Sequence, residues 1–344
     1  MDTRPIIAVD AMGGDFGPSV VVPGAVEAAR LHDLHVLLVG DTPKIEAELG
    51  KLDLSGVQFD IVQADDVVHM NEKPSDILRR KKNASIQVAC RLVKDGAAHS
   101  VVSAGHSGAT VACGMFIMGR LAGVERPALA ALLPTEKKPV VVLDAGANVD
   151  CRPYHLFQFG LMGDAFARDL LNYTSPRVSL LSIGEEEGKG NSQVKEAYEL
   201  LKLAQNLNFI GNAEGRDIFT GDVDVVVCDG FVGNVVVKMS EGLASSLIRM
   251  LKRVFTSGVL PALGGMLAKG AFKKFATTID FPEDGGAPLL ALHGQVIVCH
   301  GRSNSRAMMN AIKMSGNFVR KGTNDRLAET ILANEELTRF SRAI

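Results

Sequence analysis

Residues 178–191 read VSLLSIGEEEGKGN and carry the pattern from which the fold is predicted. The apolar run 178–183 is typical of a buried strand, and the glycines that follow it indicate a turn. Beyond the turn, apolar residues recur at the spacing of one helix face: Val194, Ala197, Tyr198 and Leu201. The stretch therefore predicts a strand, a loop and a helix in succession.

The loop in this stretch is a candidate anion site. A glycine-rich turn before a helix leaves backbone N–H groups free to bind phosphate, and Lys189 between two glycines would add a positive charge. The three glutamates 185–187 are unfavourable beside an anion, so we expect some to point away and at least one to hold Lys189. The alternative is an ordinary solvated loop in which Asn191 or Ser192 caps the helix.

Strand, glycine turn and helix alternate along most of the chain. Strands are predicted at 6–9, 35–39, 57–62, 100–103, 140–143, 178–183, 209–210, 223–228 and 295–299. Continuous apolar strands followed by helices indicate an α/β fold with a mostly parallel sheet that is covered on both faces. Functional groups in such folds gather at the carboxyl ends of the strands, so the glycine turns are the candidate site.

Two segments are candidate domain boundaries. Residues 123–139 contain prolines and end in a polar run, and residues 282–288 combine prolines, acidic residues and glycines. A chain that leaves one domain at the first segment and returns at the second gives a discontinuous layout. We therefore predict a first domain from 1–125 plus 285–344 and a second from 126–284.

Composition narrows the class of protein. The chain has 344 residues, 47% of them hydrophobic and 22% charged, with a formal net charge of -2. It can bury a large core, and no global charge attracts it to nucleic acid. Five cysteines without a CxxC pair favour reduced thiols in a cytoplasmic protein. The start of the chain resembles no signal peptide, and neither uncharged stretch, 97–119 or 254–268, is expected to span a membrane.

Six glycine turns carry polar side chains, and no one of them is specific alone. The turn 10–15 permits close approach of a ligand or is an ordinary turn before a helix, and 103–110 offers hydroxyls and N–H groups or is a capped buried helix. The turns at 144–150 and 300–304 add further polar groups. A further turn, DGFVGN at 229–234, ends in Asn234, which caps the following helix or donates its amide to a substrate oxygen. With the loop at 184–191, these turns predict a polar, glycine-lined crevice.

The common cofactor and metal motifs are absent from the sequence. No GxGxxG follows the first strand, the loop around Lys189 departs from the P-loop form, and no HExxH or metal-spaced His/Cys set occurs. We therefore predict no cofactor and no metal. A serine hydrolase with Ser107 as nucleophile stays open, with His106, His293 or His300 as base, although His106 is adjacent to the serine, which is unusual for a triad.

Taken together, these segments resemble one family. They are AVDAMGGD at 8–15, SAGHSGAT at 103–110, LDAGANVDC at 143–151, SIGEEEGKGN at 182–191, FIGNAEGRD at 209–217, DVVVCDGFVGNVVVK at 224–238, GGAPLL at 285–290 and HGRSN at 300–304. The chain is similar to the bacterial phosphate acyltransferases of phospholipid synthesis, the acyl-ACP:phosphate acyltransferase or PlsX family. It departs from that family at His106 and Ser107, where the family usually has Asn and Thr.

The resemblance implies the reaction and the fold. Inorganic phosphate attacks the thioester of a long-chain acyl-ACP, without a covalent enzyme intermediate, and gives acyl phosphate for phosphatidic acid synthesis. The implied fold has two α/β domains of three α/β/α layers, as in isocitrate/isopropylmalate dehydrogenases and phosphate acetyltransferases, and forms a homodimer. A short-chain phosphate acetyltransferase and an NAD-dependent dehydrogenase of the same fold are the alternatives.

The resemblance also implies site residues. Lys189 and Asn234 match positions expected to be catalytic. The expected substrate- and phosphate-binding residues are Asp10, Gly13, Gly14, Ser103, Gly105, Ser107, Asp144, Asn148, Gly188, Asp229, Gly230 and Ser303.

An apolar segment near 254–275 has two interpretations. Its apolar residues include Val259, Leu260, Leu263, Met266 and Leu267. Basic residues flank it on both sides: Arg249, Lys252, Arg253, Lys269, Lys273 and Lys274. Such a hairpin can insert shallowly into an anionic membrane, or it can be a dimer-interface or core helix. The resemblance favours peripheral membrane contact, where the product passes to a membrane glycerol-3-phosphate acyltransferase.

Overall fold

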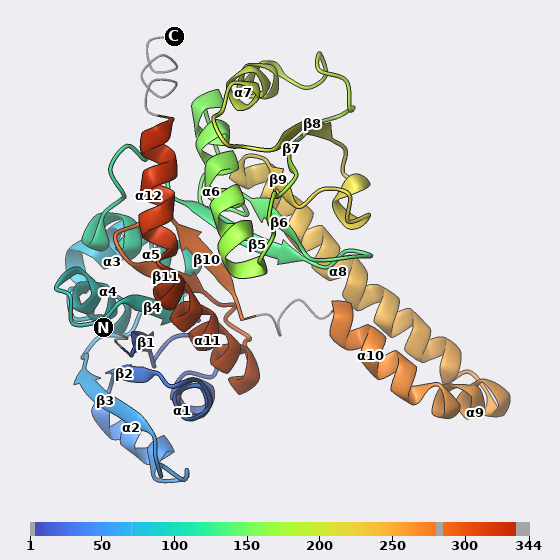
Figure 1. The fold of residues 1–344 in the computed structure, drawn as a ribbon. Coiled ribbons are helices and arrows are strands. Elements are labelled where there is room, and N and C mark those ends of the chain that lie inside the picture. Colours follow the sequence, from blue (N-terminus) through green and yellow to red (C-terminus); the bar gives the residue numbers. More distant parts are fainter. Residues whose placement is uncertain (1–3, 70, 280–284, 335–344) are drawn as a thin grey trace.

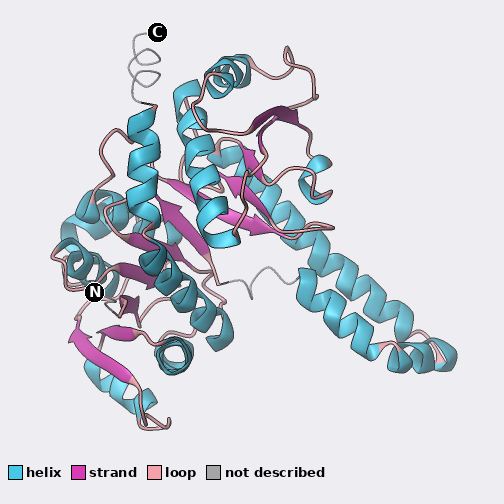
Figure 2. Cartoon of the chain, in the orientation of Figure 1, coloured by secondary structure: helices cyan, strands magenta, loops and turns pink. Residues whose placement is uncertain are grey.

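The computed structural model describes residues 4–69, 71–279 and 285–334 (Figure 1). Within these residues one 11-stranded sheet runs through the molecule in the order β3-β2-β1-β4-β11-β10-β5-β6-β9-β7-β8. Helices cover the strands on both sides (Figure 2). The predicted α/β fold with a mostly parallel sheet is therefore confirmed.

The sheet consists of two parallel groups of strands. The first contains β1 (Ile6–Asp10), β2 (His35–Gly40), β3 (Gln58–Gln63), β4 (Ser100–Ser103) and β11 (Gln295–Val298). The second contains β6 (Val140–Leu143), β7 (Val178–Leu181), β8 (Phe209–Ala213) and β9 (Val225–Val227). Most of these strands are rich in valine, isoleucine and leucine, and their central residues are buried because helices lie on both faces.

Two strands that the sequence pattern does not predict join the groups. They are β5 (Ala128–Leu133) and β10 (Ala287–Leu290), and both run antiparallel to their neighbours. Alanine and leucine in β5 favour helices, and Pro288 in β10 is unusual inside a sheet, so neither segment carries a strand signal. Three successive antiparallel pairings reverse the direction of the sheet, and the carboxyl ends of the two parallel groups therefore point in opposite directions.

The helices follow the strands as predicted. On the first half they are α1 (Pro18–His32), α2 (Thr42–Leu49), α3 (Pro74–Arg80), α4 (Ser85–Lys94), α5 (Ser107–Cys113) with the π-helical turn η1 (Gly114–Met118), α11 (Ser305–Lys321) and α12 (Thr323–Ala333). On the second half they are α6 (Pro153–Leu171), α7 (Ser192–Lys202), the 3₁₀ turn η2 (Asp217–Phe219) and α8 (Gly230–Phe255), followed by α9 (Val259–Leu267) and α10 (Lys269–Ile279).

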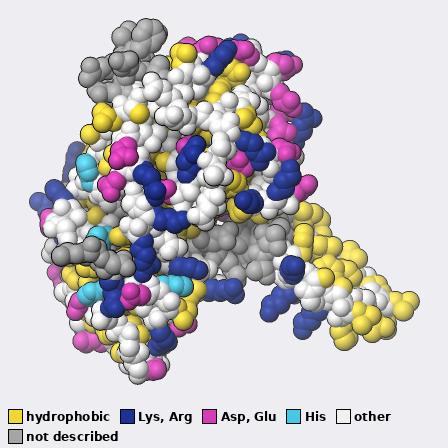
Figure 3. All heavy atoms as spheres, in the orientation of Figure 1, with side chains coloured by type: hydrophobic (Ala, Val, Ile, Leu, Met, Phe, Trp, Pro, Cys, Tyr) yellow, Lys and Arg dark blue, Asp and Glu magenta, His cyan; other side chains and the backbone are white. Residues whose placement is uncertain are grey.

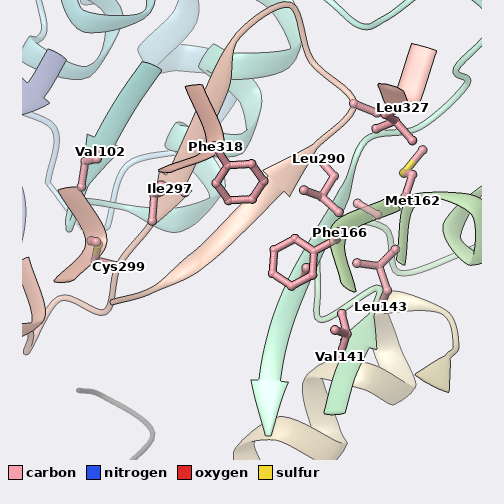
Figure 4. Close-up of a cluster of buried hydrophobic side chains, with 14 of the residues drawn as sticks. Val102, Val141, Leu143, Met162, Phe166, Leu290, Ile297, Cys299, Phe318 and Leu327 are labelled. Atoms are coloured by element: carbon pink, nitrogen blue, oxygen red, sulfur yellow. The ribbon is translucent and has the colours of Figure 1, made fainter. Parts of the chain in front are cut away.

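One hydrophobic core crosses both halves. Phe166 of α6 lies against Phe318 of α11, with ring centroids 5.7 Å apart. Figure 4 shows Leu290 of β10 and Leu143 of β6 beside this pair. The predicted division into two domains stays a prediction, and residues 282–284 of its second boundary lie outside the described residues.

The helices α8, α9 and α10 form a hairpin that projects from the body (Figure 1). The rings of Phe255 and Phe272 pack edge to face near its tip, beside α9, with their centroids 4.6 Å apart. No residue of α9 is buried, and Figure 3 shows apolar side chains gathered over this projection. Among the described residues, no helix is both long enough and apolar enough to cross a membrane.

Close packing of α1 on α11 gives a test of the fold. A Cβ atom at Gly24 would lie 2.5 Å from the Ser305 carbonyl oxygen and 2.8 Å from the Met308 Cβ. We predict that Gly24→Ala lowers the free energy of unfolding by about 1–3 kcal/mol, because backbone atoms must move apart. The control is Gly242→Ala in α8, where a Cβ meets nothing within 4 Å. Because alanine favours a helix over glycine, this change should raise the free energy of unfolding by about 1 kcal/mol. Urea unfolding that finds Gly24→Ala as stable as the native chain would contradict this close approach.

Candidate active site

The six predicted turns fall into two groups. Those at the ends of β1, β4 and β11 interlock: a Cβ at Gly13 would lie 2.7 Å from the Gly105 nitrogen, and the Asp15 N–H donates to the Gly301 carbonyl at 2.8 Å. Gly14 has a φ of 87° and lies against Gly301, which accounts for the second glycine of this turn. These close approaches fix the first group as one unit.

Asp10 holds the first group from inside. Its buried carboxylate accepts a hydrogen bond from the Ser103 hydroxyl at 2.7 Å and another from the Met12 N–H at 3.3 Å. Burial raises the pKa of Asp10, and hydrogen bonds from Ser85 and Ser103 oppose the shift. Ser303 is also buried. These side chains support the turns and present little surface to a substrate.

The departure at positions 106 and 107 has a structural explanation. The His106 Nδ1 accepts a hydrogen bond from the Ala109 N–H at 3.1 Å and so caps α5. Asparagine is a common cap, and the imidazole nitrogen fills that position here. Ser107 is exposed at the start of the helix. With His106 committed to the cap, the structure offers this pair no nucleophile-and-base geometry.

Asp144 organises the second group of turns. Its fully buried carboxylate accepts hydrogen bonds from the N–H groups of Leu129, Gly146, Ala147 and Asn148, and from the Asn148 side-chain amide. Burial raises the pKa of Asp144, and these hydrogen bonds oppose the shift. Asp144 and Asn148 therefore lie beneath the surface as the frame of the turn.

The start of α8 presses against this frame. A Cβ at Gly233 would lie 2.0 Å from the Asp144 carbonyl oxygen, and one at Gly230 would lie 2.6 Å from the Asn148 carbonyl oxygen. Only glycine permits such an approach. Asp229 caps the helix by accepting from the Val232 N–H at 2.8 Å.

Asn234 emerges from this packing with its amide free. A Cβ at Gly146 would lie 3.4 Å from the Asn234 Cβ, so the side chain lies beside the turn that follows β6. Asn234 is half-buried, and its amide has no hydrogen-bond partner in the described part of the chain. The helix is capped by Asp229 instead, which leaves the Asn234 amide available to a ligand.

Lys189 is exposed on its glycine loop. A Cβ at Gly184 would lie 2.9 Å from the Lys189 Cγ, so the lysine stem folds over the start of the loop. Gly188 is exposed beside it. Asn191 caps α7 by accepting from the Val194 N–H at 2.9 Å, as the capping alternative predicts, and a capped helix start still leaves N–H groups for an anion.

The expectation that a glutamate holds Lys189 is wrong. Glu187 pairs with Lys202 of α7 at 2.8 Å, and Glu185 approaches Arg216 at 3.3 Å. Glu186 is exposed like the other two, and its carboxylate lies over Gly184 without an ion pair in the described part of the chain. Within residues 4–69, 71–279 and 285–334, Lys189 forms no ion pair. Its ammonium group is therefore available to an anion.

A cavity of about 470 Å³ lies between this loop and the start of α8. Gly190 and Asn191 line it on the loop side, and Asp229 and Val232 line it on the helix side. Cys228 also lines the cavity, but its buried thiol donates to the Asp144 carbonyl at 3.9 Å, and burial raises the pKa of that thiol well above its ordinary value. The cavity thus joins two turns of the second group at the ends of the adjacent strands β7 and β9.

One ion pair connects the two groups of turns. The His300 Nε2 lies 3.4 Å from a carboxylate oxygen of Glu241, two turns beyond Asn234 on α8. The hydrogen bond to Glu241 raises the pKa of His300. Sequence reasoning missed Glu241, because nothing near it in the sequence signals a contact 59 residues away. No cluster of three His, Cys, Asp or Glu side chains able to hold a metal occurs among the described residues.

Comparison with known proteins places this geometry in a family. A family model described as "Fatty acid synthesis protein" matches residues 6–326. The chain is 68% identical to a phosphate acyltransferase of Nitratidesulfovibrio vulgaris over 98% of both chains. It is 65% identical to the phosphate acyltransferase of Lawsonia intracellularis, over 98% of this chain and 97% of that one.

Solved structures show the same fold at low sequence identity. A phosphotransacetylase from Streptococcus pyogenes matches with a TM-score of 0.65 at 18% identity, over 92% of this chain and 94% of that one. The EutD phosphotransacetylase from Staphylococcus aureus matches with a TM-score of 0.61 at 17% identity, with the same coverage. The predicted phosphate acetyltransferase-like fold is confirmed.

The His300–Glu241 pair predicts a pH-dependent stability. Because the native pKa of His300 lies above its ordinary value of 6.5, the stabilisation is complete below about pH 6.5 and is lost as pH rises through the native pKa. His300→Asn should therefore unfold at a lower temperature than the native chain near pH 5.5 and at the same temperature near pH 9. The ring is 61% exposed, so the effect is small, about 0.2–1 kcal/mol.

Glu241→Gln and the double variant complete this test. If His300 stabilises the protein through Glu241, adding His300→Asn to Glu241→Gln should not lower the unfolding temperature further near pH 5.5. Additive losses in melting temperature would refute the pair.

Proposed function

The chain belongs to the phosphate acyltransferase family of fatty acid synthesis proteins, and we propose that its acyl donor is a long-chain acyl-ACP. Acyl transfer to phosphate in lipid synthesis is the activity of the family. On this proposal the product is a long-chain acyl phosphate, used in phosphatidic acid synthesis. The free Lys189 side chain on a glycine loop is the observation that carries the assignment of the site.

The reaction needs positioning more than a reactive side chain. An oxygen of hydrogen phosphate attacks the thioester carbon, the C–O bond forms, the C–S bond breaks, and the phosphate proton goes to the departing thiol. Lys189 and the N–H groups at the start of α7 bind the phosphate dianion. The Asn234 amide donates to the thioester oxygen as negative charge develops there.

The nearby thiols support direct attack by phosphate. Cys228 lines the cavity, and burial raises its pKa well above the ordinary value. Burial also raises the pKa of Cys151 to about 12. Protonated thiols are weak nucleophiles, so neither cysteine is suited to form an acyl-enzyme.

The projecting hairpin supports two further proposals. Exposed apolar residues recur every three or four positions along one face of α8: Val235, Met239, Leu243, Leu247, Met250 and Val254. We assign this stripe to a second copy of the chain in a homodimer, because a stripe at this spacing fits a helix–helix interface. The apolar tip at α9 is assigned to an anionic membrane surface, where a membrane glycerol-3-phosphate acyltransferase would receive the product.

A short-chain phosphate acetyltransferase is the second candidate, favoured by the fold shared with phosphotransacetylases. Comparing phosphate-dependent thiol release from acetyl-CoA and palmitoyl-ACP separates the two. Faster turnover of acetyl-CoA would favour this candidate over the long-chain enzyme.

Lys189→Met tests the catalytic assignment. The change removes the cation and keeps a long side chain, so kcat/KM for phosphate should fall about 10²–10³-fold. Phosphate-dependent release of ACP from palmitoyl-ACP is the measurement. Lys94→Met, at the exposed last residue of α4, is the control and should keep full activity. Unchanged activity of the Lys189 variant would remove this lysine from the mechanism.

Charged residues at the tip test membrane contact. Leu260 and Leu263 are 82% and 53% exposed, so their replacement disturbs no core. The double variant Leu260→Glu, Leu263→Glu should no longer sediment with vesicles of anionic phospholipid, while turnover of palmitoyl-ACP in solution stays intact. Leu203→Glu, exposed after α7, is the control and should sediment normally. Undiminished sedimentation of the double variant would rule out the tip as the contact.

A further inference from the structure

We propose that the cavity between the Lys189 loop and the start of α8 receives the fatty acyl chain of the donor, with Ser182 at its polar end. The inference rests on the proposed function for the chemistry of the ligand. It goes beyond that function by assigning the fatty acyl chain to one cavity and by naming Ser182 as a residue that binds the acyl carbonyl.

The walls of the cavity are apolar and come from four elements. Leu156 of α6 and Leu180 of β7 are buried and form its inner part. Val194 of α7 and Val232 of α8 add apolar lining from two further elements. A hydrocarbon chain placed here leaves water and contacts side chains that already belong to the body of the protein.

Most polar groups in the lining are already satisfied by the protein. Asn191 and Asp229 accept hydrogen bonds from helix N–H groups, and the Gln193 amide donates to the Cys151 carbonyl at 2.9 Å. These groups therefore need no hydrogen bond from a ligand. An apolar occupant can therefore enter without leaving them unpaired.

The Ser182 hydroxyl is the exception. Its oxygen is buried and has no hydrogen-bond partner in the described part of the chain. It lies beside the loop glycine, where a Cβ at Gly190 would be 3.1 Å from it. A buried hydroxyl without a partner costs free energy unless a ligand supplies one. The carbonyl oxygen of an acyl group, held next to Lys189, would accept this hydrogen bond.

The order of these groups orients the donor. The polar end, with Ser182 and Gly190, adjoins Lys189, and the buried end adjoins Leu156. Ile183, between the polar end and the loop, has a side chain that is 84% exposed. A large apolar residue left uncovered at this point supplies further contact for the chain.

Filling the cavity tests the assignment. Val194→Phe and Val232→Phe occupy cavity space from two different helices. Each should lower kcat/KM for palmitoyl-ACP at least tenfold and change kcat/KM for butyryl-ACP less than twofold. Leu203→Phe, exposed on the loop after α7, is the control and should leave both donors unaffected. Equal losses for both donors, or no loss for palmitoyl-ACP, in both valine variants would overturn the proposal.

Binding of hexadecylphosphonate, measured by calorimetry, tests the cavity without turnover. Its affinity should fall at least tenfold in folded Val194→Phe and stay the same in Leu203→Phe. If the native protein releases no ACP with phosphate but binds the phosphonate in this pattern, the proposed function fails and the cavity assignment stands. If the native protein is active and the phosphonate binds Val194→Phe unchanged, the cavity assignment fails.

Ser182→Ala tests the polar end of the cavity separately from its apolar walls. Because every acyl donor has a carbonyl, the variant should lose activity with butyryl-ACP and palmitoyl-ACP by the same factor, about 5–30-fold for one hydrogen bond. Full activity with both donors would remove Ser182 from the site.

Discussion

The buried carboxylate of Asp144 is the interaction on which the second half of the molecule depends. It accepts N–H groups from its own turn and from Leu129 in β5, the strand that joins the two parallel groups. The start of α8 then packs on the same turn through Gly230 and Gly233. A carboxylate buried without these donors would be strongly unfavourable, so the joining strand, the turn and the helix must assemble together.

This dependence explains how two parallel groups of opposite direction form one molecule. A sheet whose direction reverses separates the carboxyl ends of its strands, and the glycine turns cannot all line a single edge. The helix α8 compensates for the separation: it starts at the Asp144 turn and reaches His300, beyond β11, with Glu241. The strands β5 and β10 join the two halves of the sheet, whereas the contact between the two groups of turns is made by this helix.

The sequence predicts those parts of the structure that local patterns determine. Strands rich in valine and isoleucine, the helix after Gly190, and the glycine turns are all visible in it. The strands β5 and β10 are not, because residues such as Ala130 and Pro288 oppose a strand locally and only pairing with neighbours stabilises one. The partners of the loop glutamates are also hidden, since Lys202 and Arg216 meet them through folding.

The same limit applies to the candidate site. Asp10, Asp144 and Lys189 all follow strands and look alike as candidates in the sequence. The fold distinguishes them by their hydrogen-bond and ion-pair partners. The two aspartates have partners within the protein, whereas Lys189 has none among the described residues. A polar side chain that folding leaves unsatisfied at a turn is the better candidate for contact with substrate. By that criterion we propose Lys189, Asn234 and Ser182 as the residues that contact substrate, and the aspartates as their support.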